Sequence, residues 1–336
     1  MSVEILPLLW MMILAGAITL YVLLDGFSLG VGILFPLAGS REHRDQMMAS
    51  VSPVWDGNQT WLIGGGSALF AAFPKAFNLL ASALYLPLMA MLLALVFRGV
   101  AFEFRLKAKD PLPWSISFAA GSFIAAFCQG LILGTYVQGF EYDGSRLVVG
   151  AWHFLTPFSL MTAVGVVLAY ALLAACWLIY KTEGELRDWA RARARQLFPL
   201  VLAAVGLVSL WTPWLIPDIA ERWFSWPNLI LLSPIPIWMA VFSFVLFRVL
   251  AGKQVHDALP FACCIALYVM TLLGLAVSLW PYVVPRSLSF WQAAAPRDSL
   301  LFTLVGVLLI VPVILAYTAH AYYVFRGKVR PEDAYH

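Results

Sequence analysis

The sequence has few charged residues. Asp, Glu, Lys and Arg make up 12% of its 336 residues, whereas apolar residues make up 62%. A soluble domain has about 25% charged and 45–50% apolar residues. The low charge content and the mean hydropathy of +0.86 therefore exclude a soluble globular protein and predict an integral membrane protein. The formal net charge of +3 is too small to favour nucleic acid as a partner.

Histidine is scarce, and no histidine falls in the middle of a predicted membrane span. His153 and His320 lie near the ends of predicted helices, and the other three lie in predicted loops or the tail. This placement argues against a haem held by two histidines of this chain. The sequence also lacks a P-loop, a GxSxG elbow and a metal-binding box. No catalytic centre and no metal site are expected within the chain itself.

The four cysteines lie in apolar stretches and show no CxxC spacing. They are interpreted as small buried residues rather than as metal ligands or disulfide partners. They are Cys128, Cys176, Cys263 and Cys264.

Long apolar stretches dominate the chain. A bilayer core of about 30 Å requires about 20 apolar residues per helix. The sequence predicts an all-α membrane protein, a single polytopic domain over residues 1–336, with about nine transmembrane helices. They are expected at about 7–36, 50–73, 77–104, 113–139, 151–180, 197–216, 228–250, 258–282 and 299–325. The polar segment 181–196 between two of them is interpreted as a separate solvated or interfacial helix.

The positions of Lys and Arg predict the orientation. Sixteen of the 21 basic residues lie at the ends of the first, third, fifth, seventh and ninth spans. Cytoplasmic loops carry the excess of basic residues in membrane proteins. The N-terminus is therefore expected outside and the C-terminus in the cytoplasm. The five exceptions are Lys75, Arg146, Arg222, Arg286 and Arg297.

Asp25 interrupts the first apolar stretch in its cytoplasmic half. An acidic residue within a span costs about 2.5–3.5 kcal/mol on insertion scales, so it needs an explanation. Two interpretations are open, a hydrogen bond to a neighbouring helix and a proton-handling or charge-balancing role. Gly26, Gly30 and Gly32 follow it and allow another backbone to approach closely.

Two further acids belong to the same predicted side. Asp56 lies in the first turns of the second span, where a helix dipole alone can stabilise it. Asn58 and Gln59 beside it can relay protons or join helices. Glu103 ends the third span, four residues before Lys107, which also fits a solvated helix end. Three acids that reach inward from one face resemble the entrance of a proton path.

Three motifs carry a family resemblance. They are DGFSLGVG at 25–32, PVWDGNQTW at 53–61 and FRGVAFEFR at 97–105, and KTEGELR at 181–187 and YVFRGKV at 323–329 extend them. The sequence resembles subunit II of the cytochrome bd quinol oxidases almost from end to end, most of all the cyanide-insensitive branch. It departs from the family pattern at Ser28, where a second Asp is usual, so one protonatable group is missing.

The resemblance implies a fold of two four-helix bundles plus a peripheral helix, in a multi-pass protein of the bacterial inner membrane. It implies quinol oxidation coupled to reduction of O₂ to water, with haem b and haem d, or b-type equivalents, held by a partner subunit I in a heterodimer. It also admits a structural quinone and a small single-helix subunit, besides quinol and membrane lipids.

The resemblance further implies roles for individual residues. Asp56, Glu103 and Lys107 match a cytoplasmic proton path, Asp25 matches another intramembrane acid, and Trp61 lies near a route for O₂. Apart from the resemblance, two other functions are open: a proton-coupled membrane transporter and a purely structural subunit.

Overall fold

The computed structural model describes residues 5–144, 147–148, 150–252 and 256–330. Glu4, Arg146, Lys253 and His336 lie outside the described residues. The first half of the chain forms α1 (Ile5–Leu34), the 3₁₀ turn η1 (Phe35–Leu37), α2 (Arg41–Ala49), α3 (Trp55–Ala72), α4 (Pro74–Ala83), α5 (Tyr85–Phe104), α6 (Leu112–Gln138), β1 (Glu141–Tyr142) and β2 (Leu147–Val148). The second half forms α7 (Pro157–Lys181), α8 (Gly184–Leu215), α9 (Pro217–Phe224), α10 (Asn228–Leu232), α11 (Pro234–Ala251), α12 (Ala258–Leu279), β3 (Tyr282–Val284), β4 (Leu288–Ser289), α13 (Phe290–Ala293) and α14 (Arg297–Val324).

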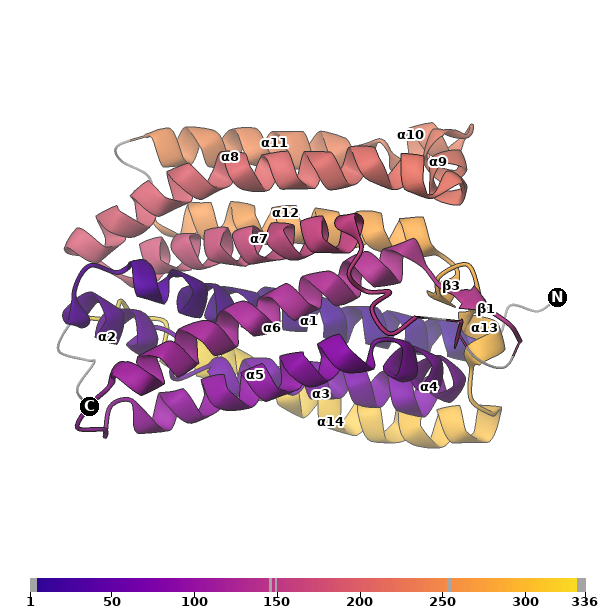
Figure 1. The fold of residues 1–336 in the computed structure, drawn as a ribbon, viewed down its shortest axis with the longest axis horizontal. Coiled ribbons are helices and arrows are strands. Elements are labelled where there is room, and N and C mark those ends of the chain that lie inside the picture. The colour runs from indigo at the N-terminus through magenta and orange to yellow at the C-terminus, as the bar shows by residue number, and fades with distance from the viewer. Residues whose placement is uncertain (1–4, 145–146, 149, 253–255, 331–336) are drawn as a thin grey trace.

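The long helices form two bundles and one peripheral helix. Helices α1, α3, α5 and α6 make up the first bundle, and α7, α8, α11 and α12 make up the second. Contacts of α7 with α1 and α6 join the bundles, and α14 lies along the outer side of α3 (Figure 1). This architecture confirms the predicted all-α membrane fold.

The described residues contain eight helical segments that are long and apolar enough to cross a membrane. The ninth long segment, α3, has only 18 residues and carries polar side chains in its first turns, so it does not reach the same apolar content. Successive long helices reverse direction, and α1 therefore begins at the end of the molecule opposite to the one where α14 finishes (Figure 1).

Three segments differ from the sequence-based expectation. The expected helix 228–250 is divided at Ser233 into α10 and α11, and Pro234 begins the second of them. The expected helix 77–104 is broken at Leu84 into α4 and α5, since Pro87 has no N–H to donate to the carbonyl of Ala83. The polar segment 181–196 is not a separate helix, because it forms the first half of the 32-residue α8. Arg191 and Arg195 of that half donate to the carbonyl oxygens of Gly252 and Leu250 and so cap the end of α11.

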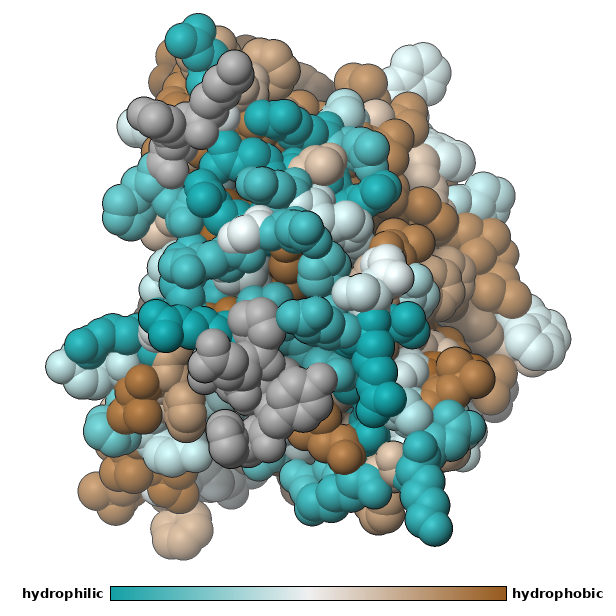
Figure 2. Space-filling view, turned by 90° about the vertical axis from the view of Figure 1, so that its left-hand side faces the viewer, coloured by the Kyte–Doolittle hydropathy of each residue, from teal (hydrophilic) through white to brown (hydrophobic). Residues whose placement is uncertain are grey.

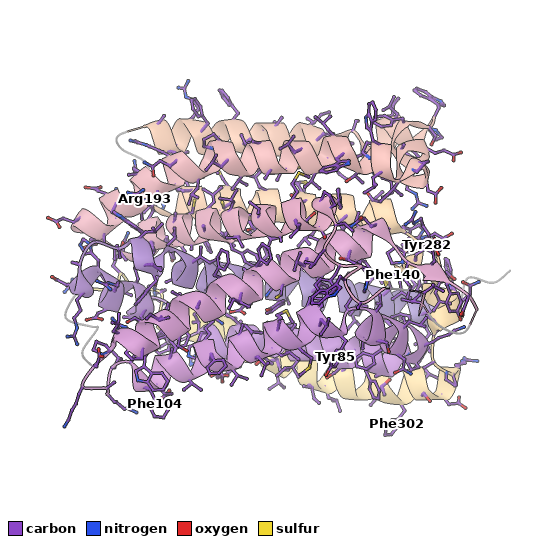
Figure 3. The ribbon with its side chains drawn as sticks, in the orientation of Figure 1. Tyr85, Phe104, Phe140, Arg193, Tyr282 and Phe302 are labelled. Carbon is purple, nitrogen blue, oxygen red and sulfur yellow. The ribbon has the colours of Figure 1, made fainter. Side chains whose placement is uncertain are left out.

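One end of the molecule is polar, and apolar residues appear along its sides (Figure 2). The end that carries α2 is largely hydrophilic, whereas apolar residues appear along the flanks (Figure 2). Figure 3 shows Phe104 and Arg193 near that end, Phe140 and Tyr282 near the opposite end, and Phe302 projecting outward from α14. Phe302 is 82% exposed within this chain. Apolar side chains exposed along the helices are expected where lipid or another membrane subunit covers them.

Candidate functional site

Asp25 lies fully buried in α1 and forms an ion pair across the first bundle. The Nη2 atom of Arg98 in α5 lies 3.1 Å from Oδ1 of Asp25, and neither side chain is exposed. The same guanidinium donates a 2.5 Å hydrogen bond to Oγ of Ser28, one turn further along α1. Both charges are withdrawn from water. Because they are opposite and paired, they link α1 to α5 without leaving a net buried charge.

Arg98 is buried, although its place near the end of the third predicted span is typical of a solvated helix end. The residue precedes the end of α5 by less than two turns, which in sequence looks like one of the basic residues that mark the cytoplasmic side. Its side chain instead points into the bundle, where a Cβ at Gly121 of α6 would lie 3.0 Å from the Arg98 Cβ. A basic residue five positions before an acid near a helix end carries no sequence signal for burial.

The glycines after Asp25 allow close helix contacts, as the sequence predicts. A Cβ at residue 30 would lie 1.9 Å from the carbonyl oxygen of Tyr170 in α7, and a Cβ at residue 32 would lie 2.0 Å from Oγ of Ser122 in α6. Gly26 faces the ring of Tyr170. Close contact of α1 with both neighbours places Asp25 at the junction of the two bundles.

A second set of polar side chains lies next to Asp25. Nε2 of Gln129 in α6 donates to the hydroxyl of Tyr21, one turn before Asp25, at 2.7 Å. The hydroxyl of Tyr170 in turn donates to Oε1 of Gln129 at 2.8 Å. These hydrogen bonds connect α1, α6 and α7, so the polar groups around Asp25 come from four helices.

Asn58 joins helices, which is one of the two roles expected for it. Its Nδ2 donates to the carbonyl oxygen of Leu24 in α1 at 2.8 Å, and its Oδ1 accepts from the hydroxyl of Tyr322 in α14 at 2.9 Å. Trp61, one turn later, is 5% exposed and contacts Ala17 and Tyr21. The inner face of α3 is therefore committed to holding α14 and α1 together.

Asp56, Glu103 and Lys107 lie on the outside of this chain. Lys107 Nζ is 3.6 Å from Glu103 Oε2, and the two side chains are 79% and 70% exposed. Asp56 is also exposed, in the first turn of α3. An exposed pair four residues apart adds only about 0.2–0.5 kcal/mol to helix stability, so this arrangement is not needed to hold the fold.

An aromatic stack brings the two acidic segments together. The rings of Trp55 and Phe102 are parallel within 7° and their centroids are 4.7 Å apart. Trp55 directly precedes Asp56, and Phe102 directly precedes Glu103, so the two carboxylates occupy adjoining helix ends on one side of the molecule. Asp25 is fully buried and does not belong to this exposed group. Its partner Arg98 precedes Glu103 by five residues, which is about 7.5 Å along a helix axis.

The described residues contain no group of three or more His, Cys, Asp or Glu side chains that could hold a metal ion. His153 contacts the carbonyl oxygen of Gly150 through Nδ1, and His43 lies 3.8 Å from Glu185. His320 and His256 are exposed. The described histidines thus lie outside the middle of the long helices.

Comparison with known proteins agrees with the fold and the motifs. Residues 6–325 match the family model described as cytochrome bd terminal oxidase subunit II. The chain is 28% identical to cytochrome bd-I ubiquinol oxidase subunit 2 of Escherichia coli K12, over 98% of this chain and 97% of that protein. It is also 28% identical to cytochrome bd ubiquinol oxidase subunit 2 of Bacillus subtilis, over 97% of each.

A solved structure shares the fold. The bd oxidase from Geobacillus thermodenitrificans contains a chain that superposes with a TM-score of 0.79 at 15% identity, covering 96% of this chain and 99% of that one. The match over nearly the whole length and the eight apolar helical segments of the described residues point to the same class of membrane protein. The chain therefore belongs to the cytochrome bd terminal oxidase subunit II family and is a multi-pass inner-membrane subunit of an oxidoreductase.

Proposed function

We propose that this chain supports quinol oxidation and O₂ reduction in two ways, as a scaffold for the haem-bearing subunit I and as the source of a cytoplasmic proton path. A cytochrome bd oxidase is a haem-containing complex, and its subunit II implies a partner subunit I. The matched proteins are oxidase subunits, and they give no support to the transporter alternative.

The observation that carries the proton path is the exposed acidic group at one end of the first bundle. Asp56 and Glu103 lie on adjoining helix ends, with Lys107 paired to Glu103. Exposure lets these groups exchange protons with water, and a path along the surface of α3 and α5 can continue into a partner subunit that covers this side. Carboxylates, an amine and ordered water are suitable carriers, since a proton cannot cross hydrocarbon unaided.

Asp25 has a different place in this proposal. Its carboxylate is paired with the guanidinium of Arg98. We assign Asp25 the charge-balancing role, at the inner end of the same path. The departure from the family at Ser28 fits this assignment, because the Ser28 hydroxyl accepts a hydrogen bond from Arg98 where a second carboxylate is usual.

The orientation in this proposal has the N-terminus in the periplasm and the C-terminus in the cytoplasm. The excess of basic residues and the hydrophilic end that carries α2 support it (Figure 2). Reduction of O₂ to water consumes four protons, and uptake from the cytoplasm with release from quinol outside generates a membrane potential.

The remaining partners are part of the same proposal. We assign the haem b and haem d groups, or b-type equivalents, to subunit I, and the described histidines of this chain support this because they lie in loops, in the short helix α2 or near the end of α14. Trp61 is assigned to O₂ access, since its buried indole lies among apolar side chains between α1 and α14. The other proposed partners and ligands of the complex are quinol, lipids, a structural quinone and a small single-helix subunit.

The test replaces the proposed carriers without changing their size. Asp56→Asn and Glu103→Gln are each expected to lower the O₂ reduction rate of the purified complex by at least about 10-fold, because a positioned proton carrier contributes about 10²–10⁴-fold. Glu185→Gln is the matched control. Glu185 is a 92% exposed acid in the first turn of α8 at the same end, and its replacement should leave the rate within about 2-fold.

The haem absorbance of each preparation reports assembly and separates a slow enzyme from a missing partner. Full O₂ reduction in both variants, with normal haem content, contradicts the proton path and leaves a structural subunit. Loss of haem content in both variants assigns the acids to the interface instead.

A further inference from the structure

A second buried ion pair lies at the end that carries the proposed proton path. Nη2 of Arg105 is 2.5 Å from Oδ1 of Asp45, and the two side chains are only 3% and 5% exposed. Asp45 belongs to α2 and Arg105 is the C-cap residue of α5. In sequence the segment REHRDQ resembles a solvated turn, so nothing marks Asp45 as buried.

Arg105 is held on several sides. Its Nε donates to Oγ of Ser115 at the start of α6 at 3.0 Å, and its guanidinium lies over the ring of Phe35 at 5.1 Å from the centroid. Its Nη1 lies 4.0 Å from the sulfur of Met48 in α2. The guanidinium therefore joins α2, η1 and the start of α6 to the end of α5.

The position of Arg105 in the chain connects it to the proposed proton path. Glu103 and Lys107 are four residues apart and point outward, whereas Arg105 lies midway between them and points inward. Residues two apart in a helix point about 200° apart, so one backbone segment presents the outer pair and the inner anchor. The segment leaves the helix here, with the amide of Arg105 bonded to Ala101 and that of Lys107 bonded to Phe104.

Helix α2, which carries Asp45, is itself fixed to the rest of the molecule. Met47 and Met48 of α2 are buried in the largest apolar cluster. Nε2 of Gln46, next to Asp45, donates to the carbonyl oxygen of Val329 at 2.7 Å, which ties α2 to the segment that follows α14. Because α2 is anchored in this way, its ion pair with Arg105 can hold the end of α5 against displacement.

We propose that Asp45 and Arg105 are a positioning pair for the proton path, which fixes Glu103 and Lys107 without carrying protons itself. This inference rests on the proposed function of Glu103. A shift of about 1 Å at a reacting group can lower a rate about 100-fold, so loss of the pair is expected to be measurable at a distance from the haems.

The decisive variant is Asp45→Leu combined with Arg105→Met in the assembled oxidase complex. Removing a single partner leaves an unpaired buried charge and can prevent assembly, whereas replacing both partners with apolar residues is often tolerated. The double variant is expected to retain haem content and to reduce O₂ about 10-fold more slowly. Asp45→Glu, which keeps the carboxylate, should recover most of the rate.

Arg41→Gln is the matched control. Arg41 also faces Asp45, at 3.8 Å, but its side chain is 71% exposed. An exposed arginine contributes little, so the rate of this variant should stay within about 2-fold.

Coupling to Glu103 separates positioning from a general structural effect. In a Glu103→Gln background, the Asp45→Leu and Arg105→Met replacements should lower the rate by less than about 2-fold further, because the effects of groups that act through the same residue are not additive. An equal fractional loss of rate in the wild-type and Glu103→Gln backgrounds overturns the inference. A full rate in the Asp45→Leu, Arg105→Met variant also overturns it. So does failure of both this variant and Asp45→Glu to assemble. If Glu103→Gln itself has a full rate, the proposed function fails; if it is slow while the double variant is normal, only the positioning role fails.

Discussion

The pair of Asp25 and Arg98 makes a quantitative prediction about stability. Both side chains are fully buried, and Arg98 also donates to Ser28. Arg98→Met leaves the Asp25 carboxylate unpaired in the bundle, and removal of one partner of a buried pair costs about 3–5 kcal/mol. Loss of the Ser28 hydrogen bond adds about 1 kcal/mol. Asp25→Asn leaves Arg98 unpaired and is expected to cost a similar 3–5 kcal/mol.

The double variant distinguishes a pair from two independent residues. Asp25→Asn combined with Arg98→Met removes both charges, so it is expected to be no less stable than the worse single variant. The coupling energy is then at least the smaller single loss, about 3 kcal/mol. Unfolding of the purified complex in mixed micelles of rising SDS content gives the free energies. Glu103 and Lys107 provide the control pair, because an exposed pair should couple by no more than about 0.5 kcal/mol. A double variant that loses the sum of the two single effects refutes the ion pair as the cause.

Two further predictions concern packing and the segment after α14. Gly30→Ala places a Cβ 1.9 Å from the Tyr170 carbonyl oxygen and should destabilise the complex by about 1–3 kcal/mol in thermal unfolding. Gly16→Ala is the control on the same helix, because no atom lies within 4 Å of its added Cβ. Equal stability of the two variants contradicts the close contact of α1 and α7. Lys181→Met removes hydrogen bonds to the carbonyl oxygens of Phe325 and Gly327. Trypsin should therefore cleave at 326–330 several times faster in this variant than in a Lys109→Met control. Unchanged cleavage would show that other contacts hold this segment.

Hydropathy and charge predict most of the architecture from the sequence. The apolar stretches predict an all-α membrane fold, and eight of the helical segments in the described residues are long and apolar enough to cross a membrane, since span length depends on local composition. The orientation drawn from Lys and Arg stays a prediction. The breaks at Leu84 and Ser233 and the continuous α8 differ from the prediction. Hydropathy alone does not register a proline near the start of a helix, nor a polar helix that extends beyond the bilayer.

The motifs locate the functional region, but they do not distinguish its inner and outer residues. Asp25 and Asp56 both look like acids at membrane depth, yet one is fully buried and the other is exposed. The difference depends on Arg98, which reaches Asp25 from a helix about 70 residues later in the chain. Asp45 and Arg105 are likewise joined only by the tertiary structure, so their pairing has no counterpart in local sequence.

The proton path is tested most directly by time-resolved proton uptake. When the fully reduced complex reacts with O₂, a pH indicator dye follows uptake while haem absorbance follows electron transfer in the same sample. With Asp56→Asn and Glu103→Gln combined, we expect uptake to slow by at least about 10-fold, while the first, proton-independent haem oxidation keeps its rate. Uptake at the unaltered rate in this variant contradicts the account.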